Sequence, residues 1–227
     1  MSTRSALPSA SQCEVCRRWA EGALCRDCID RWAAPVARCE GCGLRLPTAA
    51  TRCGACLREP PPFERCRCAV DYAFPWDGLI AAFKYRGRVE LAASLTACLL
   101  DALDRDDRGW PDLLLPVPLA PARLAERGYN QAWELARRLA TRIDRPAQAG
   151  LLRRPRSGPR QARLDRQARR RNLRGSFEVV DPQALAGRRL VLVDDVLTTG
   201  ATAVEATRSL MRAGAAAVQV WALARTP

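Results

Sequence analysis

The chain has 227 residues, a formal net charge of +13 at pH 7, and 37 Lys and Arg against 24 Asp and Glu. This length suits one domain of about 150 residues with a buried core and a smaller second one. No apolar stretch reaches the roughly 20 uncharged residues of a membrane span, and the N-terminus lacks the apolar segment of a signal peptide. We expect a cytoplasmic protein with no membrane association.

The first residues are rich in cysteine: ten of the eleven cysteines precede residue 69. Eight of them form CxxC pairs: Cys13/Cys16, Cys25/Cys28, Cys39/Cys42 and Cys53/Cys56. Two thiolates at this spacing can bind one tetrahedral zinc ion through a tight turn, and a second pair completes the ligands. A segment this short cannot build a hydrophobic core, so metal would replace one. Residues 1–62 are predicted to form a cysteine-rich zinc domain.

Two alternatives about the cysteines stay open. A disulfide scaffold would need an oxidising compartment, which the missing signal peptide argues against. Sequential pairing would give two successive zinc sites, whereas a crossed arrangement would join the first pair to the third.

The three remaining cysteines are assigned to the interior rather than to a metal site. Cys66 and Cys68 alternate with arginines in a predicted strand, and Cys98 falls on the apolar face of a predicted helix.

Three consecutive prolines, Pro60 to Pro62, mark a linker, and residues 63–227 form the predicted second domain. The expected strands are 68–74, 113–117, 148–152, 176–180, 189–194 and 217–222, and the expected helices are 77–84, 90–103, 130–143 and 200–212. Alternating strands and helices predict an α/β domain with a mostly parallel sheet flanked by helices.

The stretch from Leu190 to Thr202 carries the clearest chemistry. Its first four residues are aliphatic and predict a strand that is buried on both faces and ends at Asp194 and Asp195. Parallel sheets bind ligands at the carboxyl ends of their strands, so these two carboxylates lie where a ligand is expected. A helix start follows, with backbone amides and hydroxyls suited to an anion, at Thr198, Thr199, Gly200, Ala201 and Thr202. A phosphate there would place its sugar beside the carboxylates. The alternative is a strand that ends in a polar turn with Thr or Asp as a helix cap.

This stretch resembles the 5-phosphoribosyl 1-diphosphate (PRPP) motif of type I phosphoribosyltransferases, whose acidic pair holds the ribose hydroxyls and whose loop holds the 5-phosphate. From about Tyr72 onward the chain is similar to the ComF/GntX family. The segments that carry this resemblance are Phe83–Gly87, Leu115–Pro118, Arg127–Gln131, Arg153 to Asn172 and the acidic motif. Members join a double zinc ribbon to a phosphoribosyltransferase-like domain, and some are linked to DNA uptake. The resemblance implies the same fold here.

The resemblance also implies sites for the diphosphate. Pyrophosphate would lie at Arg127 and Gly128, where Asn130 caps the next helix or bonds the ligand. Lys84 is the only lysine of the chain, and we expect its ammonium group to make a point-charge contact with phosphate.

Residues 151–175 hold ten arginines against one acid, which predicts a flexible basic loop. By resemblance this loop closes over the active site, and Arg153, Arg154, Gln161, Arg170 and Asn172 match the family pattern, whereas Gly158 stands where the family has threonine. Arginines beside a diphosphate would neutralise its charge. A purely solvated loop and a nucleic-acid contact are the alternatives.

The resemblance implies that PRPP binds with Mg²⁺, that Asp194 and Asp195 orient the ribose, and that a nitrogen nucleophile displaces pyrophosphate. No residue pattern identifies this acceptor, and the process served would be competence, DNA uptake or nucleotide salvage. Two further functions stay open. One is a non-catalytic DNA-uptake partner that binds single-stranded DNA or a competence helicase, and the other is a PRPP-sensing regulator.

Overall fold

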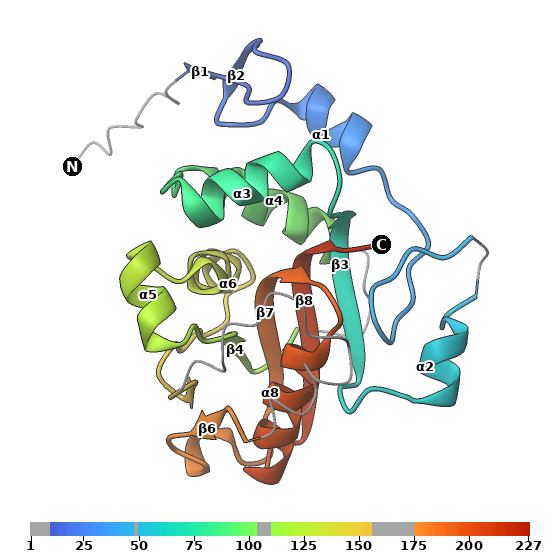
Figure 1. Cartoon of the computed structure of the whole chain (residues 1–227), viewed down its shortest axis with the longest axis vertical. Helices are drawn as coiled ribbons and strands as arrows, with labels where there is room; N and C mark the ends of the chain where they lie inside the picture. The colour runs from blue at the N-terminus through green and yellow to red at the C-terminus, as the bar shows by residue number, and fades with distance from the viewer. Residues whose placement is uncertain (1–9, 48–49, 104–109, 156–174) are drawn as a thin grey trace.

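The structure is a computed structural model that describes residues 10–47, 50–103, 110–155 and 175–227 (Figure 1). Its centre is a four-stranded sheet in the order β3-β8-β7-β4. The strands are β3 (Arg65–Asp71), β8 (Ala217–Arg225), β7 (Arg189–Leu197) and β4 (Leu113–Pro116), and all neighbours are parallel. The predicted α/β class with a parallel sheet is confirmed.

Both faces of the sheet are buried, as the aliphatic strands predict. Along β7, Val191 and Val193 belong to one hydrophobic cluster, whereas Leu190 and Leu192 belong to the other. This alternation follows from the two-residue period of a strand. The sheet therefore separates two cores, and helices must cover each of them.

One core lies under α3 (Trp76–Tyr85), α4 (Leu91–Leu103) and α6 (Gln131–Arg142), and the other under α8 (Ala201–Arg212). A further helix, α5 (Pro121–Arg127), begins at a proline, a residue suited to the first turn because its missing amide proton has no partner there. The predicted helices are found within two residues of their expected bounds. No helix in the described ranges has the length and apolar character that crossing a bilayer requires.

Three strand predictions are corrected. The strand expected to end at Asp194 runs on to Leu197, because Val196 and Leu197 continue to pair with β8. In place of a strand at 148–152, only Ala147 bridges to Leu114 of the sheet. The short β5 (Leu152–Arg153) and β6 (Glu178–Val179) instead form a separate antiparallel pair, so the strand expected at 176–180 lies outside the main sheet.

The N-terminal residues run along one side of this α/β unit (Figure 1). They contain β1 (Ala10–Gln12), β2 (Trp19–Glu21), α1 (Arg26–Trp32) and α2 (Gly54–Arg58). Arg88 bonds Glu14 at 2.6 Å, and the Trp76 indole donates to the carbonyl of Trp32 at 2.9 Å. The cysteine-rich segment is therefore docked on the α/β unit, and the proposed boundary at residue 62 stays a prediction.

Candidate functional site

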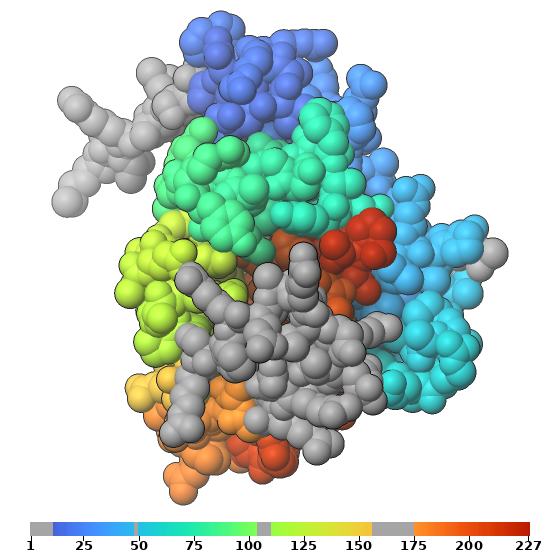
Figure 2. Space-filling view, in the orientation of Figure 1, coloured from blue at the N-terminus to red at the C-terminus, as the bar shows by residue number. Residues whose placement is uncertain are grey.

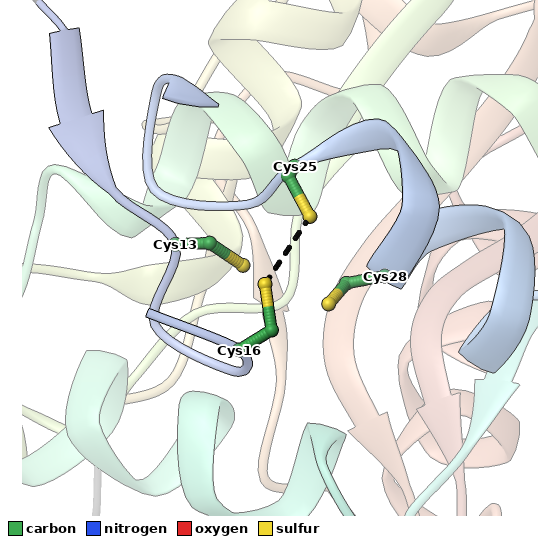
Figure 3. A group of neighbouring side chains, drawn as sticks. All are labelled: Cys13, Cys16, Cys25 and Cys28. Carbon is green, nitrogen blue, oxygen red and sulfur yellow. Dashed lines mark hydrogen bonds between the residues drawn. The ribbon is translucent and has the colours of Figure 1, made fainter. Parts of the chain in front are cut away.

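The cysteines form two separate groups. The Sγ atoms of Cys13, Cys16, Cys25 and Cys28 lie within 4.8 Å of one another, as do those of Cys39, Cys42, Cys53 and Cys56. Figure 3 shows the four sulfur atoms of the first group pointing toward a common centre. This arrangement supports the sequential pairing of the CxxC motifs and not the crossed one. Each group has the four-sulfur donor set of a structural zinc site.

The two groups are built in the same way. The first pair of each lies on a tight turn: the amide of Arg17 donates to Cys13 O at 2.9 Å, and that of Gly43 donates to Cys39 O at 2.7 Å. The second pair begins a helix, since Cys25 and Cys53 are the N-caps of α1 and α2. Gly43 has a φ of +71°, a conformation that glycine adopts without strain.

The chemistry of the thiols fits a cation. Burial raises thiol pKa values, but hydrogen bonds outweigh it at one member of each group and lower the pKa of Cys13 to about 6 and that of Cys53 to about 7. Burial and neighbouring thiols raise the pKa values of Cys28 and Cys56 instead. Four thiolates packed this closely would repel one another unless a metal ion were bound. Zinc could therefore occupy both groups.

The remaining cysteines lie in the interior. Cys66, Cys68 and Cys98 are all buried, and none belongs to either four-cysteine group. The Sγ atoms of Cys66 and Cys68 lie 3.7 Å apart on the same side of β3. Their assignment to the interior is confirmed.

The acidic pair lies next to the only lysine. Lys84 Nζ, from the last turn of α3, is 2.9 Å from Oδ1 of Asp195 on β7, and both side chains are largely buried. Burial and the charge of Asp195 raise the pKa of Asp194 to about 8, while Lys84 acts in the opposite direction. Burial alone would lower the pKa of Lys84, but Asp195 and Asp194 raise it overall. Near pH 7 the site thus holds a Lys84–Asp195 ion pair beside a protonated Asp194.

This titration gives a stability prediction. Because folding raises the pKa of Asp194 from 3.8 to about 8, the folded state binds more protons than the unfolded state across this window, so rising pH lowers the free energy of unfolding. Asp194→Asn removes this effect. Relative to wild type, the variant should gain about 1–2 kcal/mol between pH 6.5 and 8.5, measured by urea unfolding. The exposed Asp144→Asn serves as control, and equal pH profiles for all three proteins would contradict the assignment.

The predicted anion cradle follows the strand directly. Thr198 is exposed, Gly200 has a φ of +75°, and α8 begins at Ala201. The hydroxyl of Thr199 accepts a hydrogen bond from the amide of Ala201 at 3.4 Å, which is a weak capping contact. A Cβ on Gly200 would meet no atom within 4 Å, so the space above the loop is open. The start of a twelve-residue helix here matches the geometry that binds phosphate.

The segment from Arg127 to Gln131 is tied to the end of α3. Gly128 has a φ of +78° and ends α5, and Asn130 caps α6 by accepting from the amide of Ala132 at 3.0 Å, which confirms the capping prediction. The Tyr129 hydroxyl donates to Phe83 O, and Gln131 Nε2 donates to the carbonyl of Lys84 at 3.4 Å. These contacts connect the end of α3 with residues 127–131, the two places where the sequence predicts contacts with the diphosphate. No sequence pattern predicted the contacts themselves.

Of the predicted basic-loop residues, Gln161 and Arg170 lie outside the described ranges. Arg153 is exposed on β5, whereas its neighbour Arg154 is half-buried and packs 5.6 Å from the Phe177 ring. Burial and then repulsion by Arg123 lower the pKa of Arg154, and Asp194 partly offsets both. Its Nε atom is buried with no hydrogen-bond partner among the described residues. Arg154 is therefore a better anchor for an anion near Asp194 than Arg153.

Curated proteins resemble most of this chain. DNA utilization protein YhgH of Escherichia coli (strain K12) is 36% identical over 207 residues, which cover 89% of this chain and 90% of the relative. Competence protein F of Haemophilus influenzae is 33% identical over 211 residues, which cover 91% of this chain and 92% of the relative. Competence protein ComFC of Bacillus subtilis is 33% identical over 141 residues, which cover 61% of this chain and 54% of the relative. A scan against protein-family models found no match.

Among solved structures, the similar chains include a glutamine PRPP amidotransferase from B. subtilis, with 18% identity, a TM-score of 0.39, and coverage of 62% of this chain and 30% of that chain. An adenine phosphoribosyltransferase from Thermoanaerobacter pseudethanolicus has 17% identity, a TM-score of 0.39, and coverage of 62% and 83%.

Proposed function

The chain belongs to the ComF/GntX family, and on that premise we propose that it binds PRPP with Mg²⁺ and transfers the phosphoribosyl group to a nitrogen acceptor. The observation that carries this proposal is the ion pair between Lys84 of α3 and Asp195 of β7, because Asp195 lies a few residues before the open N-terminus of α8. An acidic group for a sugar and an amide cradle for a phosphate thus follow each other on one edge of the sheet. We propose the cytoplasm as the place of action.

Each part of PRPP would have its own contacts. The 5-phosphate would accept hydrogen bonds from residues 198–202, and the ribose hydroxyls would donate to Asp194 and Asp195. Mg²⁺ bound to the diphosphate prefers oxygen ligands and would add positive charge beside the acids. That charge favours loss of the proton from Asp194. Lys84 could then turn from Asp195 toward the diphosphate.

The same groups would assist the transfer. As the bond between C1 of the ribose and a diphosphate oxygen breaks, C1 gains positive charge, which the carboxylates stabilise. Lys84, Arg127 and Arg154 stabilise the negative charge on departing pyrophosphate. The nitrogen of the acceptor forms the new bond to C1 and gives its proton to a carboxylate or to water. The chain has no histidine, so catalysis would depend on positioning and electrostatics rather than on an imidazole base.

Calorimetric titration of the zinc-loaded protein with PRPP, with and without Mg²⁺, tests the donor site. We expect binding that depends on Mg²⁺, and pyrophosphate release when nitrogen bases are added. No binding by folded protein would overturn the proposal. Binding without turnover for any acceptor would favour the PRPP-sensing regulator.

A second candidate function is contact with single-stranded DNA or a competence helicase. The names of the relatives, DNA utilization protein and competence protein, and the charge of +13 favour it. A basic loop captures DNA phosphates in a salt-dependent way, because binding releases counterions.

This second function predicts a change in salt dependence. Replacing Arg169, Arg170 and Arg171 by Ala should reduce the slope of log affinity against log salt for single-stranded DNA by about 2, since the slope is roughly 0.7 per phosphate contact on single strands. Fluorescence anisotropy over a salt series measures it. An unchanged slope would exclude this loop from DNA binding.

A further inference from the structure

The second cysteine group touches the strand that leads into the phosphate loop. Arg225, the last residue of β8, is buried, and its Nε donates to the carbonyl of Cys42 at 2.8 Å. Its Nη1 donates to the carbonyl of Leu197 at 3.2 Å. Leu197 ends β7 and immediately precedes Thr198. One guanidinium therefore joins a zinc-ligand turn to the start of the anion cradle.

Other contacts place the same two segments together. A cavity of about 130 Å³ has Cys42 and Cys56 on one side and Thr199 and Gly200 on the other. In Figure 2 the C-terminal residues, in red, lie against the cysteine-rich segment, in light blue. The two segments thus lie side by side around Arg225, with a small cavity between them.

Arg225 also brings a charge to this junction. Its hydrogen-bond partners are the carbonyl oxygens of Cys42, Leu197 and Thr226. Carbonyl groups satisfy the guanidinium donors without cancelling the charge, which the thiolates of the adjacent Cys39–Cys56 group partly offset. A positive charge behind the amides of the phosphate loop favours a bound anion, and the low dielectric of the interior strengthens that effect.

We infer that Arg225 is a positioning residue that couples metal occupancy of the Cys39–Cys56 group to binding of the 5-phosphate at residues 198–202. This inference rests on the proposed PRPP site. When the second group holds its metal, the turn at Cys42 keeps its carbonyl on Arg225, and Arg225 holds the end of β7. Loss of the metal frees the turn, withdraws the carbonyl, and leaves a buried charged donor without its partner, which is costly. The phosphate loop then loses its support.

The first group provides an internal reference. Cys13 and Cys28 belong to the hydrophobic cluster that includes residues of α3 and α4. Figure 1 shows β1, β2 and α1 on the far side of α3 and α4 from α8. Among the described residues, no hydrogen bond or ion pair joins this group to residues 198–202. Coupling should therefore be specific to the second group.

Calorimetric binding of ribose 5-phosphate, which carries the phosphate and the sugar without the diphosphate, tests the inference in the full zinc-loaded chain. Arg225→Met should weaken this binding about tenfold, a size typical of coupled sites. The matched control is Arg38→Met, because Arg38 ties the same cysteine group to Asp71 of β3 and bonds Gly43 O, but does not contact β7. The control should stay within twofold of wild type. Equal effects of the two variants would overturn the inference.

Linkage demands the reciprocal effect in the wild-type chain. At saturation, ribose 5-phosphate should raise the zinc affinity of one of the two four-cysteine groups by about tenfold, measured by equilibrium competition with a chelator, and leave the other unchanged. Cys16→Ser, which removes an exposed ligand of the first group, identifies which affinity belongs to which group. Two zinc affinities that do not change with ribose 5-phosphate would contradict the coupling. Absent binding of ribose 5-phosphate to wild type would also overturn the coupling, whereas the titration with PRPP decides the proposed function separately.

Discussion

Replacing Asp195 by Asn should weaken the binding of PRPP by about 100-fold. Asp195 is the buried carboxylate that pairs with Lys84 at 2.9 Å, and in the proposed site it would also accept from a ribose hydroxyl. Hydrogen bonds to charged groups contribute about 1.5–3 kcal/mol each, and about 2.7 kcal/mol corresponds to 100-fold in affinity. Calorimetry with Mg²⁺ measures the change. The control is Asp101→Asn, which alters a half-buried carboxylate of α4 that pairs with Arg26.

A second substitution separates binding from stability. Asp195→Asn removes the hydrogen-bonded partner of the buried Lys84 ammonium and leaves only Asp194 to balance its charge, so it should also lower the free energy of unfolding, by up to about 3 kcal/mol. Lys84→Met added to Asp195→Asn removes the orphaned charge and should restore much of this stability. PRPP affinity should stay low in the double variant. Affinity that recovers together with stability would show that Asp195 acts only through the fold.

Replacing Cys56 by Ser should lower the zinc content from two ions per chain to one. Each four-cysteine group would hold one ion, and structural zinc sites contribute apparent binding free energies of about 10–16 kcal/mol near neutral pH. Because α2 is only five residues long, residues 39–56 should lose their fixed structure without the metal. Elemental analysis gives the zinc content, and limited proteolysis reports the loosened segment.

The control for this experiment is Cys98→Ser, since Cys98 is buried in α4 outside both groups. It should retain two zinc ions. A wild-type protein that holds no zinc and titrates without free thiols would instead show the disulfide scaffold, and both zinc sites would be excluded.

The local parts of this structure could be read from the sequence. The CxxC spacing identified all eight zinc-ligand candidates, because each pair is formed by a short turn or by the first turn of a helix. The aliphatic run before Asp194 predicted a buried strand. The sequence did not show that β7 continues past Asp195. Its last residues, Val196 and Leu197, remain in the strand because they pair with β8, and that pairing depends on a segment distant in the sequence.

Contacts between distant segments could not be predicted in this way. The phosphate contact of Lys84 stays a prediction, and its ion pair with Asp195 could not be foreseen, because no local pattern links α3 to β7. The difference between Arg153 and Arg154 depends on tertiary packing, since Arg153 is exposed on β5 and Arg154, just after that strand, packs against the Phe177 ring. The bond from Arg225 to Cys42 depends on how the cysteine-rich segment docks, which follows from tertiary packing alone.

The most direct test of the proposed donor site is a crystal structure of the zinc-loaded protein with PRPP and Mg²⁺. It should show the ribose hydroxyls on Asp194 and Asp195, the 5-phosphate on the backbone amides of residues 198–202, and Lys84 turned toward the diphosphate. Ligand bound elsewhere, with the Lys84–Asp195 pair intact and the loop at Gly200 facing solvent, would contradict the assignment.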